Sequence, residues 1–113
     1  MKIVNLTPHS INLMPNGADG TEIIIPPSGT VARCATNRVQ VGTVDIDGVT
    51  ISINRTQFGE VEGLPDPQPD TVYIVSSLVA QAVKGQRVDV LIVDDAVRDD
   101  QGRIIGARAL ART

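Results

Sequence analysis

Hydrophobic and polar positions alternate through the first half of the chain, which is the pattern of half-buried strands. In residues 9–14, for example, Ile11 and Leu13 share one face. Pro8 interrupts the apolar start of the chain, because a proline cannot donate to a strand ladder and holds the preceding residue extended. The alternation predicts short strands at residues 2–6, 9–14, 21–25 and 30–35.

The clearest predicted element is a β-hairpin centred on Asp47 and Gly48. This dipeptide favours a type I′ turn, whose twist matches that of two antiparallel strands. β-Branched residues alternate on both sides of it, in residues 41–46 and 49–53. We expect residues 55–62 to continue the sheet.

The pattern changes after a proline-rich connector at residues 63–70. Residues 71–93 predict a strand, a helix near 77–84 and a second strand. The link between these two strands is close to the minimum length for a parallel crossover. A turn at residues 98–103 predicts a final hairpin.

Together these elements predict an α+β, β-rich single domain of residues 1–113. It would contain a β-rich part (1–62), the connector (63–70) and a strand–helix–strand–hairpin part (71–110). Each part is too small to be stable alone, and 113 residues suit one domain. A partly closed barrel or a curved mixed sheet would bury the one main helix.

Composition narrows the classes of ligand. The net charge is −3 and only 2% of residues are aromatic, whereas nucleic-acid-binding proteins carry a basic surface and often stacking aromatic rings. We therefore expect no nucleic acid polymer as a partner. All basic residues except Lys2 and Lys84 are arginines, and arginine grips phosphate or carboxylate at two points. A small phosphorylated ligand fits this bias, and so does a simple genomic preference for arginine.

Targeting and metal signals are missing from the sequence. Cys34 is the only cysteine, so neither an intrachain disulfide nor a cysteine-rich metal site can form. The N-terminus has no signal-peptide pattern, and no apolar stretch is long enough to span a bilayer. We expect a cytoplasmic protein that contacts no membrane and holds no cofactor and no metal.

His9 is the only histidine and follows the proline bend. A histidine can act as a general base near neutral pH if a carboxylate orients it and a nucleophile lies nearby. Asp89, Asp99 and Ser77 are candidates for these roles. Alternatively, His9 contacts a ligand, or it only satisfies backbone groups at the bend.

The start of the predicted helix is a candidate anion site. Free N–H groups and the helix dipole attract anions there, although Ser76 or Ser77 also fits a plain helix cap. Arg87 and Asp89 would share a strand face, where they pair with each other or bind a ligand. The acidic turn near residues 94–100 is explained by turn chemistry better than by a metal. The candidate ligand-binding residues are His9, Ser76, Ser77, Arg87 and Arg98.

Several stretches, taken in order, resemble a family of small uncharacterised proteins encoded by bacteriophages and prophages. They are NLTPHSINL (5–13), PPSGTVARC (26–34), GLPDP (63–67), TVYIVSSLVAQA (71–82), RVD (87–89) and VRDDQGRIIGARAL (97–110). The resemblance spans nearly the whole chain and implies a phage accessory context. Members often carry a cysteine after the final glycine of this pattern, where this chain has Ala107.

The leading functional hypothesis is a non-catalytic protein that binds a small anionic ligand. By analogy with small phage proteins, the ligand could be a nucleotide second messenger, held by a homo-oligomer that counters host defence. One alternative is a protein-interaction module, such as an inhibitor of a host protein or a minor structural phage protein. A second is a small nucleotide hydrolase or lyase with His9 as its base. No GxSxG, HExxH, CxxC or GxGxxG motif occurs.

Overall fold

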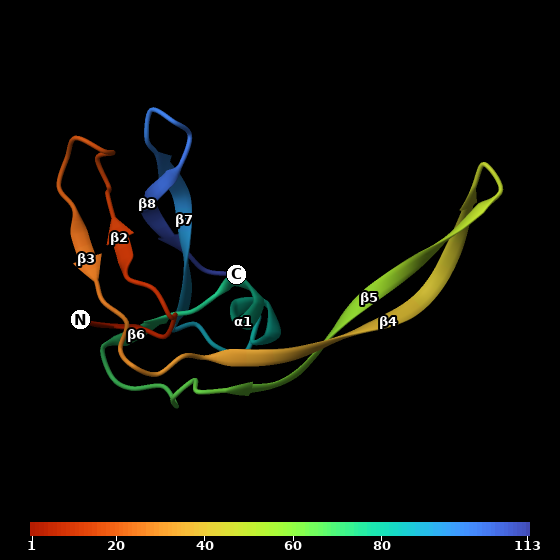
Figure 1. The fold of residues 1–113 in the computed structure, drawn as a ribbon. Helices are drawn as coiled ribbons and strands as arrows, with labels where there is room; N and C mark the ends of the chain where they lie inside the picture. Colours follow the sequence, from red (N-terminus) through yellow and green to blue (C-terminus); the bar gives the residue numbers. More distant parts are fainter.

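The structure is a computed structural model that describes residues 1–113 (Figure 1). Strands make up 52% of the chain and helix 5%, which confirms the predicted β-rich fold with one helix. The elements are β1 (Lys2–Asn5), β2 (Ile11–Leu13), β3 (Ile23–Ile25), β4 (Arg33–Ile46), β5 (Val49–Glu62), β6 (Thr71–Ile74), α1 (Ser77–Ala82), β7 (Val90–Arg98) and β8 (Ile104–Ala111).

Six strands form one curved mixed sheet in the order β1-β6-β7-β8-β2-β3, and this sheet partly closes into a barrel. β6 and β7 are parallel and are joined through α1, which confirms the predicted crossover. β7 and β8 form the predicted final hairpin. We call residues 1–32 and 63–113 the body.

The core of the body lies around α1. Leu6, Tyr73 and Val79 are each at most 3% exposed, and the neighbouring apolar residues of β6, α1 and β7 pack with them. Burying one side chain of this size contributes about 2 kcal/mol. α1 is only six residues long, so packing on this core stabilises it more than helix propensity does.

The hairpin at Asp47 and Gly48 forms as predicted, but it is much longer and stands apart. β4 and β5 form a separate two-stranded sheet, which we call the arm. Residues 30–35, expected as a strand of their own, instead lead into the start of β4. Figure 1 shows the arm projecting away from the body.

The arm makes the molecule elongated. The radius of gyration is 17.6 Å, against about 13 Å for a compact domain of this length. No residue of β4 or β5 is buried. Residues 55–62, expected to continue the sheet, belong to β5, which pairs only with β4.

The base of the arm is fixed to the body. Cys34 and Val61 are opposite each other in the arm and pack against the core around α1. Just before β4, the amide of Ala32 donates to the carbonyl of Leu6 at 3.0 Å. The arm therefore leaves the body from a defined anchor, which is buried at Ala32 and half-buried at Cys34 and Val61.

None of the helices is long and apolar enough to cross a membrane.

Candidate functional site

The bend that contains His9 is organised by Asn5, which is only 1% exposed at the end of β1. The Oδ1 atom of Asn5 accepts from the backbone N–H of Thr7 at 2.9 Å. Its Nδ2 atom donates to the carbonyls of His9 at 2.8 Å and Ile25 at 3.1 Å. One buried amide thus holds the bend by these three hydrogen bonds, beside a proline that has no N–H to donate.

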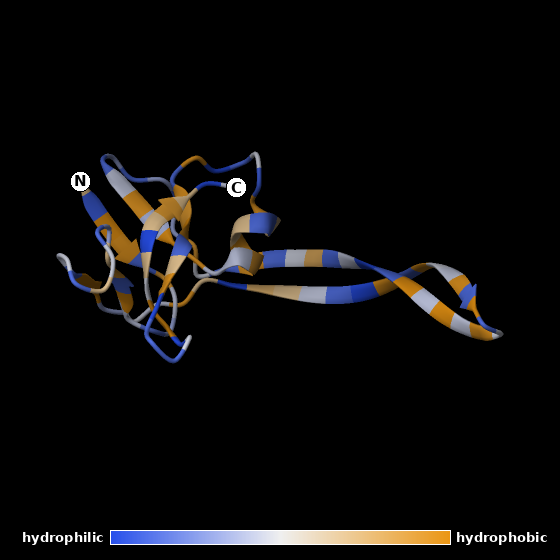
Figure 2. Ribbon diagram, turned by 90° about the horizontal axis from the view of Figure 1, so that it is seen from above, coloured by the Kyte–Doolittle hydropathy of each residue, from blue (hydrophilic) through white to orange (hydrophobic).

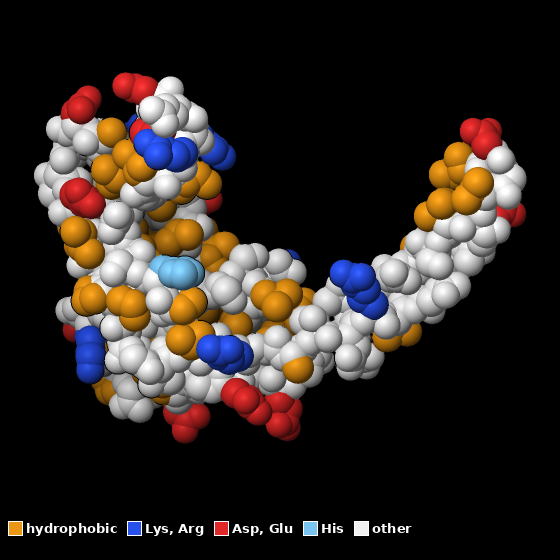
Figure 3. Space-filling view, in the orientation of Figure 1, with side chains coloured by type: hydrophobic (Ala, Val, Ile, Leu, Met, Phe, Trp, Pro, Cys, Tyr) orange, Lys and Arg blue, Asp and Glu red, His pale blue; other side chains and the backbone are white.

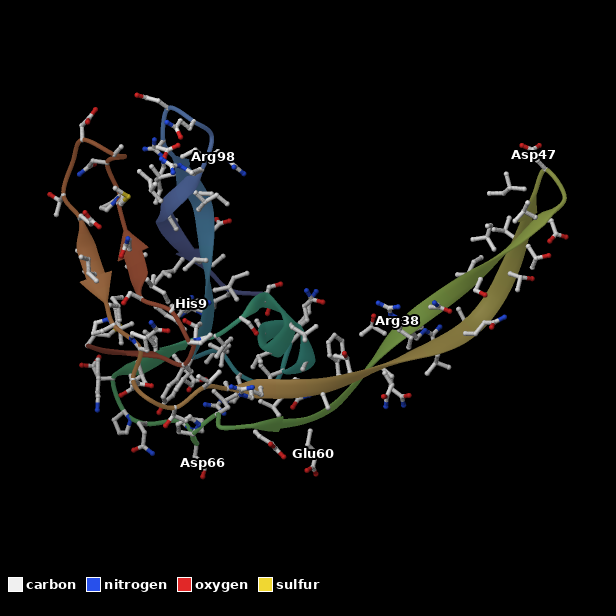
Figure 4. All side chains as sticks on the ribbon, viewed as in Figure 1. His9, Arg38, Asp47, Glu60, Asp66 and Arg98 are labelled. Atoms are coloured by element: carbon white, nitrogen blue, oxygen red, sulfur yellow. The ribbon has the colours of Figure 1, made fainter.

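His9 contributes to this bend through its backbone. Its carbonyl also lies 3.0 Å from the hydroxyl of Thr7, while its side chain is exposed (Figure 4). No hydrogen bond or ion pair joins the imidazole to Asp89, Asp99 or Ser77, the partners considered for a catalytic role. The contacts at residue 9 are therefore those of a structural bend.

An open hollow of about 550 Å³ lies between this bend, the start of α1 and the base of the arm. It contains a single cationic side chain, Arg33, and a single carboxylate, Glu62, which face each other across the two arm strands. The hydroxyl residues Thr7 and Ser76 also line it, and most of the other lining residues are apolar. Its size is in the range of small-molecule sites.

The two serines of the predicted site have different roles. Ser76 is the N-cap of α1, and its Oγ accepts from the amide of Val79 at 3.4 Å. Ser77 is exposed and lies in the first turn, where its Oγ accepts from the Nε2 of Gln81 at 3.2 Å. Only Ser76 lines the hollow.

Arg87 is held by Asp89 in a two-pronged ion pair. The Nε and Nη2 atoms of Arg87 lie 2.9 and 2.8 Å from the two carboxylate oxygens, and Nη2 also donates to the carbonyl of Pro65. The hydrogen bond from Arg87 lowers the pKa of Asp89, and the same bond raises the pKa of Arg87. The predicted pairing within the chain is therefore present, and it occupies the guanidinium group.

Arg98 lies at the far end of β7, beside the turn of the final hairpin (Figure 4). Its Nη1 donates to the carbonyl of Gly102 at 2.7 Å. In the same turn, Asp99 accepts from the backbone amides of Gln101 and Arg103. The bond from the Arg103 amide, with those from Gln101 and the Arg103 side chain, lowers the pKa of Asp99. The acidic cluster thus contains the turn chemistry expected from the sequence.

The structure does not bring the predicted ligand-binding residues into one site. Ser76 lines the hollow and His9 lies next to its Pro8 wall, whereas Arg87 and Arg98 do not line it. Sequence reasoning missed Arg33 as the cation of this hollow and Asn5 as the residue that holds the bend. A polar residue inside the apolar run KIVNL, before Leu6, was the available signal for Asn5.

The arm carries a second candidate surface, the distal apolar face, formed by Val44, Ile46, Val49, Ile51 and Ile53. The cross-strand register and the alternation along β5 place all five side chains on one face. Each is 43–58% exposed. Figure 2 shows hydrophobic and polar residues alternating along the far half of the arm, and Figure 3 shows the hydrophobic side chains gathered near its tip.

The opposite face of the distal arm is polar. It consists of Thr43, Asp45, Thr50 and Ser52, and the hydroxyl of Thr50 donates to Asp45 at 2.7 Å. The arm is therefore amphipathic, like a strand pair that covers a core, but no part of this chain covers it.

No protein-family model matches the chain, and the search of curated proteins and that of solved structures each found no similar protein.

Proposed function

We propose that this chain is an accessory protein that acts by contacting another protein through its arm. The observation that carries the proposal is the distal apolar face, five aliphatic side chains held on one side of a ribbon that nothing in the chain covers. Contiguous exposed apolar surface on a folded protein marks an interaction site. The sequence resemblance supports a phage or prophage context for this contact.

The half-buried base of the arm supports this proposal. Cys34 and Val61 are packed against the body, so the ribbon is presented in a defined direction. A two-stranded hairpin alone in water is marginally stable at best. A ribbon whose strands are each fourteen residues long is therefore best explained as a surface that is completed by a partner.

Site-specific photocrosslinking in bacterial cells tests this function. A benzophenone amino acid replaces Ile51 on the distal apolar face, Ser52 on the polar face or Val88 on the body, which is 80% exposed. We expect a light-dependent adduct with a discrete protein only from position 51. Equal adducts at all three positions, or none at position 51, would contradict the proposal.

The hollow beside α1 supports a second candidate function, the binding of a small anionic ligand such as a nucleotide signal without turnover. Arg33 and the hydroxyls of Thr7 and Ser76 line a space of about 550 Å³, which is large enough for such a ligand. Arg33 would then bind the anionic ligand in place of Arg87, because the guanidinium of Arg87 is already paired with Asp89.

A thermal-shift screen against nucleotides and cyclic nucleotides tests this second function. A ligand at a hundred times its dissociation constant adds about 2.7 kcal/mol of stability. The shift should be lost in Arg33→Gln and kept in the control Arg98→Gln, which lies outside the hollow. Chromatography of the mixture should return the ligand intact. An altered ligand would instead support the hydrolase or lyase alternative, and no shift across the panel would count against this site.

A further inference from the structure

We propose that the partner of the arm is a second copy of this chain, and that the two arms pack with their distal apolar faces together and their tips pointing in opposite directions. This inference rests on the proposed function, because it names the protein that the arm contacts. Three features of the arm support it: its apolar face, the order of its charges and a hollow halfway along it.

The apolar face suits a two-fold interface, in which the same patch on both subunits must be complementary to itself. A face made only of Val and Ile satisfies this requirement. The register places Val44 opposite Ile51 and Ile46 opposite Val49, which gives a continuous strip that ends near the tip. Two such faces pack at the usual distance between stacked sheets, about 10 Å.

The charges along the arm select the antiparallel orientation. Residues 39–54 contain two acidic residues, Asp45 and Asp47, and no lysine or arginine. Arg38 and Arg55 follow directly on the body side of this stretch, so the arm is acidic at its tip and basic at its middle (Figure 4). None of these four residues forms an ion pair within the chain.

Antiparallel packing brings the tip of one arm onto the middle of the other. Arg55 lies on the same strand face as Ile51 and Ile53, about 20 Å from the turn at 3.3 Å per residue. Asp47 of one copy then reaches Arg55 of the other, twice by symmetry, with the apolar strip between the two contacts. Parallel packing would instead place the two Asp47 carboxylates together, and like charges at an interface disfavour that arrangement.

A hollow lies where the tip of the second arm would arrive. It measures about 460 Å³, and its lining includes Val39, Val41 and Phe58 as well as Arg55. Val41 is the extra residue of a β-bulge between Gln40 and Gly42, which disrupts the ladder beside this hollow. The tip of the arm is apolar and carries the carboxylate of Asp47. It therefore complements a concave, largely apolar surface that carries the guanidinium of Arg55.

Sedimentation equilibrium of the intact chain tests the proposal with matched variants. The wild-type chain should be in equilibrium between monomer and dimer, with a dimer fraction that rises with protein concentration. Ile51→Asp, on the apolar face, should abolish the dimer, whereas Ser52→Asp, its neighbour on the polar face, should keep it. Asp47→Arg and Arg55→Asp should each weaken the dimer by about tenfold or more, and the double exchange should restore it. Circular dichroism controls for folding, since all four side chains are exposed.

The outcomes separate this inference from the proposed function. A monomeric wild type that still crosslinks to a different protein from position 51 would overturn the self-association and leave the arm as a contact surface. A dimer that dissociates in Ile51→Asp but is not restored by the double exchange would overturn the antiparallel arrangement. A monomer with no adduct at position 51 would overturn both.

Discussion

Val44 lies directly opposite Ile51 in the arm, and the two side chains remain 43% and 45% exposed. A cross-strand pair of this kind normally faces a second layer of protein, because each strand of a sheet presents one face to a core. Here the second layer is missing within the chain. The arm therefore has the sequence pattern of a hairpin that covers a core but lies exposed to solvent, and the proposed contact with another protein would account for both features.

Asn5→Ala should destabilise the body by about 2–3 kcal/mol, because it removes the bonds to Thr7 and leaves the half-buried carbonyl of Ile25 without this donor. His9→Ala should change the stability by less than about 0.5 kcal/mol, since residue 9 is bound through its carbonyl, which alanine keeps. Urea unfolding followed by circular dichroism measures both. A large loss in His9→Ala would show that the imidazole supports the bend.

The Arg87–Asp89 pair should make the stability of the folded chain depend on pH in the acidic range. Asp89 has a lowered pKa in the folded chain, so its contribution is complete above the ordinary aspartate pKa of about 3.9 and is lost as the pH falls through the folded value. Near neutral pH, Asp89→Asn should cost about 2 kcal/mol, less than for a fully buried pair, because the two side chains are 16% and 14% exposed.

Unfolding midpoints in urea between neutral pH and pH 3 test this dependence. The difference in unfolding midpoint between wild type and Asp89→Asn should shrink as the pH falls. Asp100→Asn, at an exposed position of the turn between β7 and β8, is the control and should follow wild type at every pH. A difference that stays constant down to pH 3 would show that the carboxylate charge contributes nothing.

Gly63→Ala should disturb the base of the arm. Gly63 has a φ of +79°, and an added Cβ would lie 2.5 Å from the carbonyl oxygen of Val31. Gly85 has the same φ with open space around it, so Gly85→Ala measures the cost of the backbone conformation alone, about 1 kcal/mol. Gly63→Ala should cost about 1–2 kcal/mol more. If thermal unfolding shows the same loss of stability for Gly63→Ala and Gly85→Ala, the close approach to Val31 is easily relieved.

Ser76→Ala should destabilise the chain by about 1 kcal/mol, because Ser76 caps α1. Ser77→Ala should be nearly neutral, since its exposed bond to Gln81 is of the kind worth a few tenths of a kcal/mol. Chemical denaturation distinguishes the two, and the reverse order would reassign the cap to Ser77.

The sequence predicted the elements with the strongest local signals. Asp47 and Gly48 formed the expected hairpin turn with φ values of +52° and +82°, and Ser76 formed one of the two expected caps. The crossover through α1 also followed from hydrophobic spacing and connector length. These features depend on residues close together in the chain.

The placement of the hairpin could not be predicted in the same way. Alternation of Val and Ile with polar residues indicates that one face is covered, but not whether the cover comes from the same chain or from another. The candidate site was missed for a related reason. Arg33 and Ser76 are far apart in sequence, and only the tertiary fold brings them to the same hollow.

Cysteine crosslinking between two arms tests whether they pack in antiparallel orientation. In a Cys34→Ser background, the variants Asp47→Cys and Arg55→Cys are mixed and treated with a short bifunctional thiol reagent. Antiparallel packing predicts efficient crosslinking of Asp47→Cys to Arg55→Cys and little crosslinking of Asp47→Cys to itself. Crosslinks that join two tips, or no crosslinks between copies, would contradict antiparallel packing of the arms.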